Sequence, residues 1–238
     1  MYVLIDYSNV HEIWRVRPLR QFLQAILEKV PSEISARTER VRARFYGGWF
    51  EEHLSSRHAQ RLAPAIEETF PGPIHQIRED GLPIIADAEL ATNVVIASTG
   101  HFTHTFVRRS KIGSLDFDEG QIVGCASSVA CPAAAIRQSL SGGQCSVAGC
   151  EIESSKFVYR AEQKLADTLL AVDLMLLVAD SEETIVVVSD DSDVLPAVVA
   201  GMIKGTRIVH VRTRANNRDW PHDWVERERN YVGAKLTG

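Results

Sequence analysis

The sequence lacks the segments that direct a chain into or across a membrane. No stretch approaches the roughly 18 consecutive apolar residues that a membrane-spanning helix needs. The first residues, MYVLIDYSNV, have neither the basic start nor the small-residue cleavage site of a secretory signal. We therefore expect a cytoplasmic protein with no membrane partner.

The chain also lacks an excess of positive charge. Its 26 Lys and Arg residues stand against 31 Asp and Glu residues, so the formal net charge is −5. No global basic field points to a nucleic acid, and a polyanionic partner would need local basic patches or bound cations. Basic runs lie at 37–44, 107–111 and 207–218, and Trp220 and Trp224 follow the third. Such runs are most often solvated faces, but they could hold phosphates while the tryptophans stack on bases.

Several catalytic signatures are missing. There is no Gly-x-Ser-x-Gly or Cys/His arrangement for acyl transfer, and no Walker or Rossmann glycine pattern for nucleotides. The tripeptide at 6–8, DYS, lacks the Asp-x-Asp pair of the haloacid dehalogenase phosphatases, which makes a phosphate-ester hydrolase a weaker alternative. His101 and His104 are expected in a loop rather than at a metal ion, because no acidic partner accompanies them.

Apolar strands that alternate with amphipathic helices are what the sequence does contain. With 238 residues and 45% apolar content, the chain can bury the core of one α/β domain with a small insertion. This alternation predicts a parallel sheet that is flanked by helices on both faces. The predicted strands are 2–6, 41–50, 93–98, 184–189 and 206–212. The predicted helices are 18–30, 53–70, 156–180 and 193–205.

The alternation stops between residues 99 and 155, which we interpret as an insertion into a domain formed by 1–98 and 156–238. The insertion contains all four cysteines, in the pattern Cys-x5-Cys, a thirteen-residue gap and Cys-x4-Cys: Cys125, Cys131, Cys145 and Cys150. Clustered thiols in a segment with little apolar content predict a structural Zn²⁺ site that supplies folding energy. The alternative is four thiols that pack as small apolar groups.

Acidic residues follow two of the predicted strands. Asp6 ends the first strand, and three acids follow the fourth: Asp190, Asp191 and Asp193. Ligands bind outside the carboxyl ends of parallel strands, so these side chains are candidates for one site. Gathered carboxylates repel each other unless a cation compensates, and Mg²⁺ or Mn²⁺ prefers oxygen ligands. The alternative is that Asp6 ends a strand, while Asp191 and Asp193 only stabilise a helix start.

The longest predicted helix, 156–180, carries Lys164 and Asp167. Residues three apart share one helix face, so these two are expected side by side. Asp167 interrupts an apolar stripe and is a candidate ligand, whereas Asp173 is expected to point elsewhere and to be solvated. Lys164 could contact a phosphate or pair with Asp167, and the sequence leaves both roles open.

The order of these pieces resembles the NYN family of the PIN-like nuclease superfamily. The segments that carry the resemblance are LIDYSNV, EQKLADTLLAVDLM and VVVSDDSDVLPAV, within about residues 1–50 and 156–212. In that family a strand ends in Asp with Asn nearby, a helix carries Lys-x-x-Asp, and a later strand leads to Ser-Gly-Asp-x-Asp. The resemblance implies four metal-binding acids: Asp6, Asp167, Asp191 and Asp193. It implies three supporting residues: Asn9, Lys164 and Ser189.

The chain departs from this pattern at Asp190, where the family usually has Gly for a tight turn. Asp tolerates the left-handed backbone better than most residues, so the turn is expected to persist. The cysteine insertion is a second departure.

The resemblance implies a PIN-like α/β fold and a ribonuclease that hydrolyses phosphodiester bonds with Mg²⁺ or Mn²⁺. RNA is the expected partner, with DNA as a variant, and a protein partner or a homo-oligomer stays open. The alternative from another class is a non-catalytic adaptor that binds nucleic acid or protein with the same fold.

Overall fold

The computed structural model describes residues 1–95, 105–110, 149–151, 160–180, 183–214 and 228–236. The chain divides into two compact units, residues 1–107 with 163–238 and residues 108–162. The domain boundaries at 98/99 and 155/156 stay predictions. Most of the second unit lies outside the described residues, so the fold below is that of the first unit.

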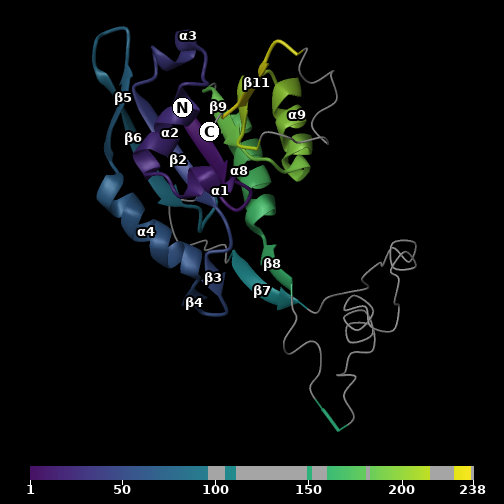
Figure 1. The fold of residues 1–238 in the computed structure, drawn as a ribbon. Coiled ribbons are helices and arrows are strands. Elements are labelled where there is room, and N and C mark those ends of the chain that lie inside the picture. The colour runs from purple at the N-terminus through teal and green to yellow at the C-terminus, as the bar shows by residue number, and fades with distance from the viewer. Residues whose placement is uncertain (96–104, 111–148, 152–159, 181–182, 215–227, 237–238) are drawn as a thin grey trace, which may run out of the picture. The chain divides into compact units, whose positions relative to one another are not determined.

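A mostly parallel sheet forms the centre of the first unit (Figure 1). Within the described residues it has seven strands, in the order β11-β10-β9-β1-β2-β6-β5. Neighbouring strands are parallel except for β5, which pairs antiparallel with β6. The strands are β1 (Tyr2–Asp6), β2 (Arg40–Tyr46), β5 (Gly72–Ile77), β6 (Pro83–Leu90), β9 (Ile185–Val188), β10 (Ile208–Arg212) and β11 (Tyr231–Lys235). The predicted α/β class with a parallel sheet is confirmed.

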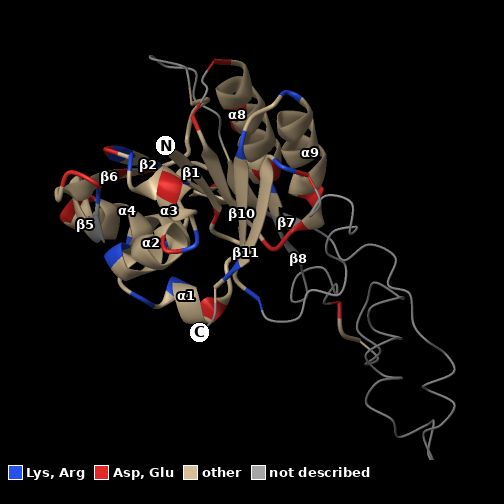
Figure 2. Ribbon diagram, turned by 90° about the horizontal axis from the view of Figure 1, so that it is seen from above, with Lys and Arg blue, Asp and Glu red and all other residues tan. Residues whose placement is uncertain are grey.

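Helices cover both faces of this sheet (Figure 2). One face packs against α2 (Leu19–Leu27) and α4 (Arg57–Thr69), and the other against α8 (Ala166–Asp180) and α9 (Leu195–Ile203). Successive side chains of a strand point to opposite faces, so Val3 and Ile5 join the first cluster while Leu4 joins the second. Burial on both faces explains why β1 is a short, wholly apolar run before its final acid.

Shorter elements complete the first unit. They are α1 (Glu12–Arg15), α3 (Ser32–Ser35) and the 3-10 helix η1 (Ser192–Val194). A second, smaller sheet has the order β4-β3-β7-β8, formed by β3 (Phe50–Glu51), β4 (Leu54–Ser55), β7 (Phe106–Ser110) and β8 (Arg160–Lys164). Strands β7 and β8 each cross the boundary between the two units in the sequence. In the part of the chain that is described, no helix has both the length and the apolar character needed to cross a membrane.

Two of the predicted elements are wrong. Residues 93–95 form no strand; the strand in this region is β6, which ends at Leu90. The predicted helix 156–180 begins only at Ala166, because β8 continues to Lys164 and Leu165 adopts a left-handed backbone with φ of 71°. A left-handed residue cannot continue a right-handed helix toward its N-terminus, so it separates β8 from α8.

Candidate functional site

The strand order places the candidate site at the carboxyl ends of β1 and β9. From β1 the chain continues to β2 on one side, whereas β9 pairs with β1 on the other side and leads to β10. Such a reversal of strand order leaves a crevice outside the carboxyl ends, where ligands bind in open α/β sheets. Asp6 is the last residue of β1, and Ser189 and Asp191 closely follow β9.

Asp6 is held in place by two hydrogen bonds. Its side chain is buried, with 1% of the residue exposed. Its Oδ2 atom accepts from Asn9 Nδ2 at 2.8 Å and from Ser189 Oγ at 2.7 Å. The backbone N–H of Asn9 also donates to the Asp6 carbonyl oxygen at 3.1 Å, which closes the turn after β1. Two of the three predicted supporting residues, Asn9 and Ser189, therefore contact this acid.

Asp191 joins the same network from the other strand. Asn9 Nδ2 lies 3.2 Å from Asp191 Oδ2, and the Asp191 N–H donates to Ser189 Oγ at 3.0 Å. Asp191 Oδ1 also accepts from the N–H of Asp193 at 3.0 Å, as the N-cap of η1. The capping role that the sequence suggested for Asp191 is present, and it leaves Oδ2 facing Asn9 and Asp6.

The fourth acid, Asp167, lies in the first turn of α8 and is exposed. Its pKa is raised by partial burial and by the negative charges of Asp191 and Asp193. Burial raises the pKa of Asp6 to about 6, and the charge of Asp167 adds to this, while the hydrogen bonds from Ser189 and Asn9 act in the opposite direction. Asp167 thus lies within electrostatic reach of the other three predicted acids.

The donor set fits a hard divalent cation by its chemistry. It consists of carboxylate oxygens, and a cation would offset both the burial and the smaller repulsion that raise the pKa of Asp6 and Asp167. As placed, however, no three His, Cys, Asp or Glu side chains among the described residues form a group that could hold a metal ion. The chemistry of the acids thus suits Mg²⁺ or Mn²⁺, but the side chains do not stand as a closed set of ligands.

The predicted pairing of Lys164 with Asp167 on one helix face is wrong. Lys164 ends β8, Asp167 lies in α8, and the left-handed Leu165 separates the two elements. Helical spacing therefore does not relate these two side chains. Whether Lys164 contacts a phosphate or an acid stays a prediction.

Asp173 is buried rather than solvated, which corrects the sequence-based expectation. Its exposed fraction is 0%. Its Oδ2 atom accepts from Tyr46 Oη at 2.7 Å and lies 3.4 Å from Arg44 Nε, and its Oδ1 accepts from the N–H of Val95 at 2.9 Å. Burial raises its pKa, whereas these partners lower it. Asp173 thus ties the middle of α8 to β2. It is not part of the acidic edge, the name used here for Asp6, Asp167, Asp191 and Asp193 at the carboxyl ends of β1 and β9.

Asp190 also has a role that the sequence did not reveal. It is not among the described non-glycine residues with positive φ, so the expected left-handed turn is wrong. Its buried carboxylate instead accepts from the N–H and the hydroxyl of Thr213 and from the N–H of Arg214. The hydroxyl oxygen of Thr213 in turn accepts from the N–H of His11 at 2.8 Å. Asp190 thus ties together the loops after β1, β9 and β10.

His210 is a further residue that sequence reasoning missed. It is fully buried on β10, and burial lowers its pKa to about 3. Its Nε2 lies 3.1 Å from the carbonyl oxygen of Ser189, and since a carbonyl can only accept, this nitrogen donates. The neutral ring therefore supports the backbone beneath the hydroxyl group that contacts Asp6.

Trp49 and the basic run 37–44 do not contribute to the acidic edge. Trp49 packs in the core, with 1% exposed, as expected for a packing residue. The arginines of the run already have partners along β2. Arg40 pairs with Asp87, Arg42 donates to the Tyr2 hydroxyl, and Arg44 pairs with Glu89 and Asp173.

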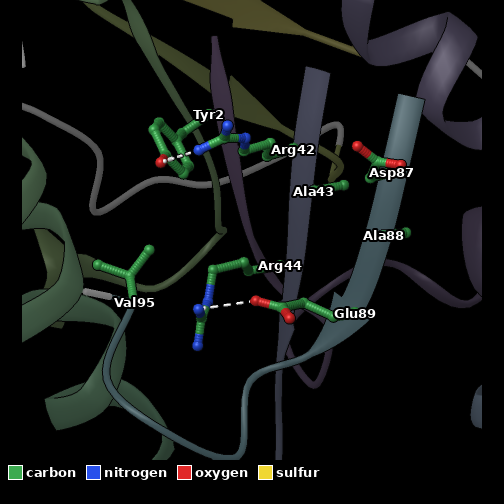
Figure 3. A pocket seen from close by; sticks show the side chains of 8 residues that line it. All are labelled: Tyr2, Arg42, Ala43, Arg44, Asp87, Ala88, Glu89 and Val95. Carbon is green, nitrogen blue, oxygen red and sulfur yellow. Dashed lines mark hydrogen bonds and ion pairs between the residues drawn. The ribbon is translucent and has the colours of Figure 1, made fainter. Parts of the chain in front are cut away.

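A cavity of about 230 Å³ lies beside the middle of the sheet (Figure 3). It is lined by Tyr2, Arg42, Ala43, Arg44, Asp87, Ala88, Glu89 and Val95. Its two arginines are engaged, because Arg42 contacts Tyr2 at 2.7 Å and Arg44 contacts Glu89 at 2.7 Å. The lining does not include the acids at the carboxyl ends, so this cavity is separate from the candidate site.

Several predicted residues lie outside the described part of the chain. They are Cys125, Cys131, Cys145, His101, His104, Trp220 and Trp224. Cys150 is described by itself and is partly exposed. The four-cysteine zinc site therefore stays a prediction from the sequence.

No protein-family model, curated protein or solved structure matches the chain.

Proposed function

We propose that this protein is a divalent-metal-dependent ribonuclease with a PIN-like fold. The observation that carries the proposal is the junction of Asp6 and Asp191 at the carboxyl ends of adjacent parallel strands, where the amide of Asn9 contacts both carboxylates. An acid that only caps a helix or ends a strand does not need a second carboxylate on the same amide group. It does not need two further acids nearby either. Carboxylates arranged in this way suit the binding of Mg²⁺ or Mn²⁺.

The residues of the edge have distinct parts in this proposal. One bound divalent cation would lower the pKa of a water molecule and a second would neutralise the departing 3′-oxygen, which leaves 5′-phosphate and 3′-hydroxyl ends. Asp6 and Asp191 would be the direct ligands, and Asp167 and Asp193 would bind directly or through water. Asn9 and Ser189 hold the carboxylate of Asp6 in one orientation. Lys164 is assigned to a substrate phosphate or to an acid of the site.

The test is cleavage of labelled single-stranded and structured RNA with Mn²⁺, Mg²⁺ or EDTA. We expect cleavage only with a metal ion, and a loss of at least about 100-fold in Asp191→Asn, because a ligand carboxylate is removed. Asp180→Asn is the matched control, since Asp180 ends α8 while Asp167 lies in its first turn, about 20 Å away along the axis. Equal activity of Asp191→Asn and wild type would refute the site. RNA binding without cleavage in every condition would favour the adaptor.

A further inference from the structure

Three basic side chains lie on the face of the sheet that α2 and α4 cover, at the same end of the sheet as the acidic edge. They are Arg15 of α1 and His58 and Arg61 of α4, which we term the α1–α4 basic cluster. Figure 1 shows α1 and the start of α4 at the end of the sheet where β2 leads into β3. His58 and Arg61 are three residues apart in one helix and so share a face.

Tyr7 connects this cluster to the acidic edge. It directly follows Asp6, and its ring joins the core beneath α2 and α4, on the face opposite to Leu4. Arg61 Nη2 donates to the Tyr7 hydroxyl at 3.4 Å. A strand of nucleic acid that crosses the carboxyl ends of β1 and β9 therefore has the acids on one side and Arg61 on the other.

The two arginines of the cluster have no acidic partner among the described residues. Arg15 Nε is also buried without a hydrogen-bond partner in the described part of the chain. The pKa of His58 is lowered by partial burial and by the charges of Arg61 and Arg15, with Glu51 acting in the opposite direction. The lowered pKa favours the neutral imidazole, so the cations here are the two guanidinium groups, and a bound anion would stabilise both and would favour the protonated form of His58.

Arginines elsewhere in the described residues contrast with this cluster. Arg37 lies 3.8 Å from Glu79, Arg40 pairs with Asp87, and Arg78 contacts Glu39 at 3.2 Å. Arg37 precedes β2, Arg40 begins it, and Arg78 lies beside its start. All three arginines are therefore at the amino end of the sheet. These three arginines at the amino end are thus paired with acids, whereas Arg15 and Arg61, at the end where the acids of the candidate site lie, have no ion pair among the described residues.

We propose that Arg15, His58 and Arg61 bind backbone phosphates of the RNA strand whose cleaved phosphate lies at Asp6 and Asp191. The proposal rests on the proposed function for its substrate. Arginine supplies a planar fork of donors that matches phosphate oxygens, and such contacts fix the position of a nucleic acid without reading its sequence. The cluster therefore sets where the strand lies relative to the acids, for RNA of any sequence.

The test measures binding without cleavage, by fluorescence anisotropy of a labelled single-stranded RNA in EDTA. We expect Arg61→Ala and Arg15→Ala each to weaken binding about tenfold at low salt. Each should also reduce the slope of log K against log salt concentration by about 0.7, the value for one lost phosphate contact on a single strand. Arg61→Lys keeps the charge and should retain most of the affinity. Arg37→Ala, an exposed arginine at the amino end, is the control and should bind as wild type does.

Thermal melting of each variant identifies any that fail to fold; if Arg61→Ala is one of them, the affinity and salt slope of Arg15→Ala test the proposal. Affinity in Arg61→Ala and Arg15→Ala equal to that of wild type would overturn the proposal, as would a loss of the same size in Arg37→Ala. Binding of polyglutamate in preference to RNA, with the same loss in Arg61→Ala, would also overturn it in favour of an acidic protein partner. Because EDTA prevents cleavage, these outcomes are separate from the test of the nuclease.

Discussion

Of the four acids of the acidic edge, Asp6 is the one whose side chain is buried. Burial raises its pKa from 3.8 to about 6, so the folded state binds a proton more tightly than the unfolded state does. A raised carboxyl pKa lowers stability as the pH increases from about 4 through about 6. The free energy of unfolding should therefore lose about 3 kcal/mol over that range from this group alone.

Asp6→Asn should remove this loss while it keeps the shape of the side chain. In EDTA we expect the variant to gain stability relative to wild type as the pH rises from 4 to 7, by up to about 3 kcal/mol. Urea unfolding at several pH values measures the difference, with Asp180→Asn as the control for an acid at the exposed end of α8. Parallel stability profiles of Asp6→Asn and wild type would contradict the assignment of a buried, repelled carboxylate.

Single residues also show where sequence reasoning stopped. Asp6 and Asp191 could be predicted together because each closely follows an apolar strand, and the ends of parallel strands meet. The roles of Asp173 and Asp190 could not, because their partners Tyr46 and Thr213 lie 127 and 23 residues away in the sequence. A buried acid and a solvated one look alike in a sequence when the partner that satisfies the buried one is distant.

At the scale of elements, α8 is held to the sheet by a polar network as well as by apolar packing. Asp173 receives hydrogen bonds from Tyr46 Oη and the Val95 N–H and lies 3.4 Å from Arg44 Nε. Truncation to Asp173→Ala leaves a buried hydroxyl and a buried guanidinium without this partner, so we expect a loss of about 3–5 kcal/mol of stability. Urea unfolding measures it.

A double-mutant cycle separates the network from a simple loss of volume. Tyr46→Phe removes the hydroxyl donor alone, and in Asp173→Ala/Tyr46→Phe no hydroxyl is left unpaired. The double variant should therefore cost less than the sum of the two single variants, with a coupling of about 1 kcal/mol or more. Additive costs would show that the hydrogen bond between these side chains contributes nothing beyond packing.

The elements that the sequence revealed are those with a strong local pattern. Strands β1 and β9 are mostly apolar runs buried on both faces, β10 is a buried run interrupted by His210, and α2 has its apolar residues at helical spacing. β8 reads RAEQK, which contains no apolar residue beyond alanine, and pairing rather than composition makes it a strand. β6 alternates apolar and acidic residues beside the edge strand β5, so its burial is only partial. Non-local pairing is not visible in a short window of sequence.

For the whole molecule, the proposed site predicts that stability depends on divalent cations. A ligand that binds only the folded state adds RT ln(1 + [L]/Kd), which is about 3 kcal/mol at 100 times Kd. For a chain of 238 residues this corresponds to a rise in Tm of roughly 5–10 °C on addition of Mn²⁺. Differential scanning fluorimetry of metal-free protein measures the rise, and it needs neither RNA nor catalysis.

Whether the rise in Tm depends on Asp191 shows where the stabilising cation binds. Asp191→Asn should abolish the rise in Tm, because it removes a direct ligand, while Asp180→Asn should keep it. The same rise in wild type and Asp191→Asn would place the stabilising cation elsewhere and would remove the physical basis for the proposed chemistry. A rise confined to the intact site, together with RNA binding but no cleavage, would show that the four acids hold a structural cation. Stabilisation and cleavage lost together in Asp191→Asn would show that one cluster of carboxylates serves both.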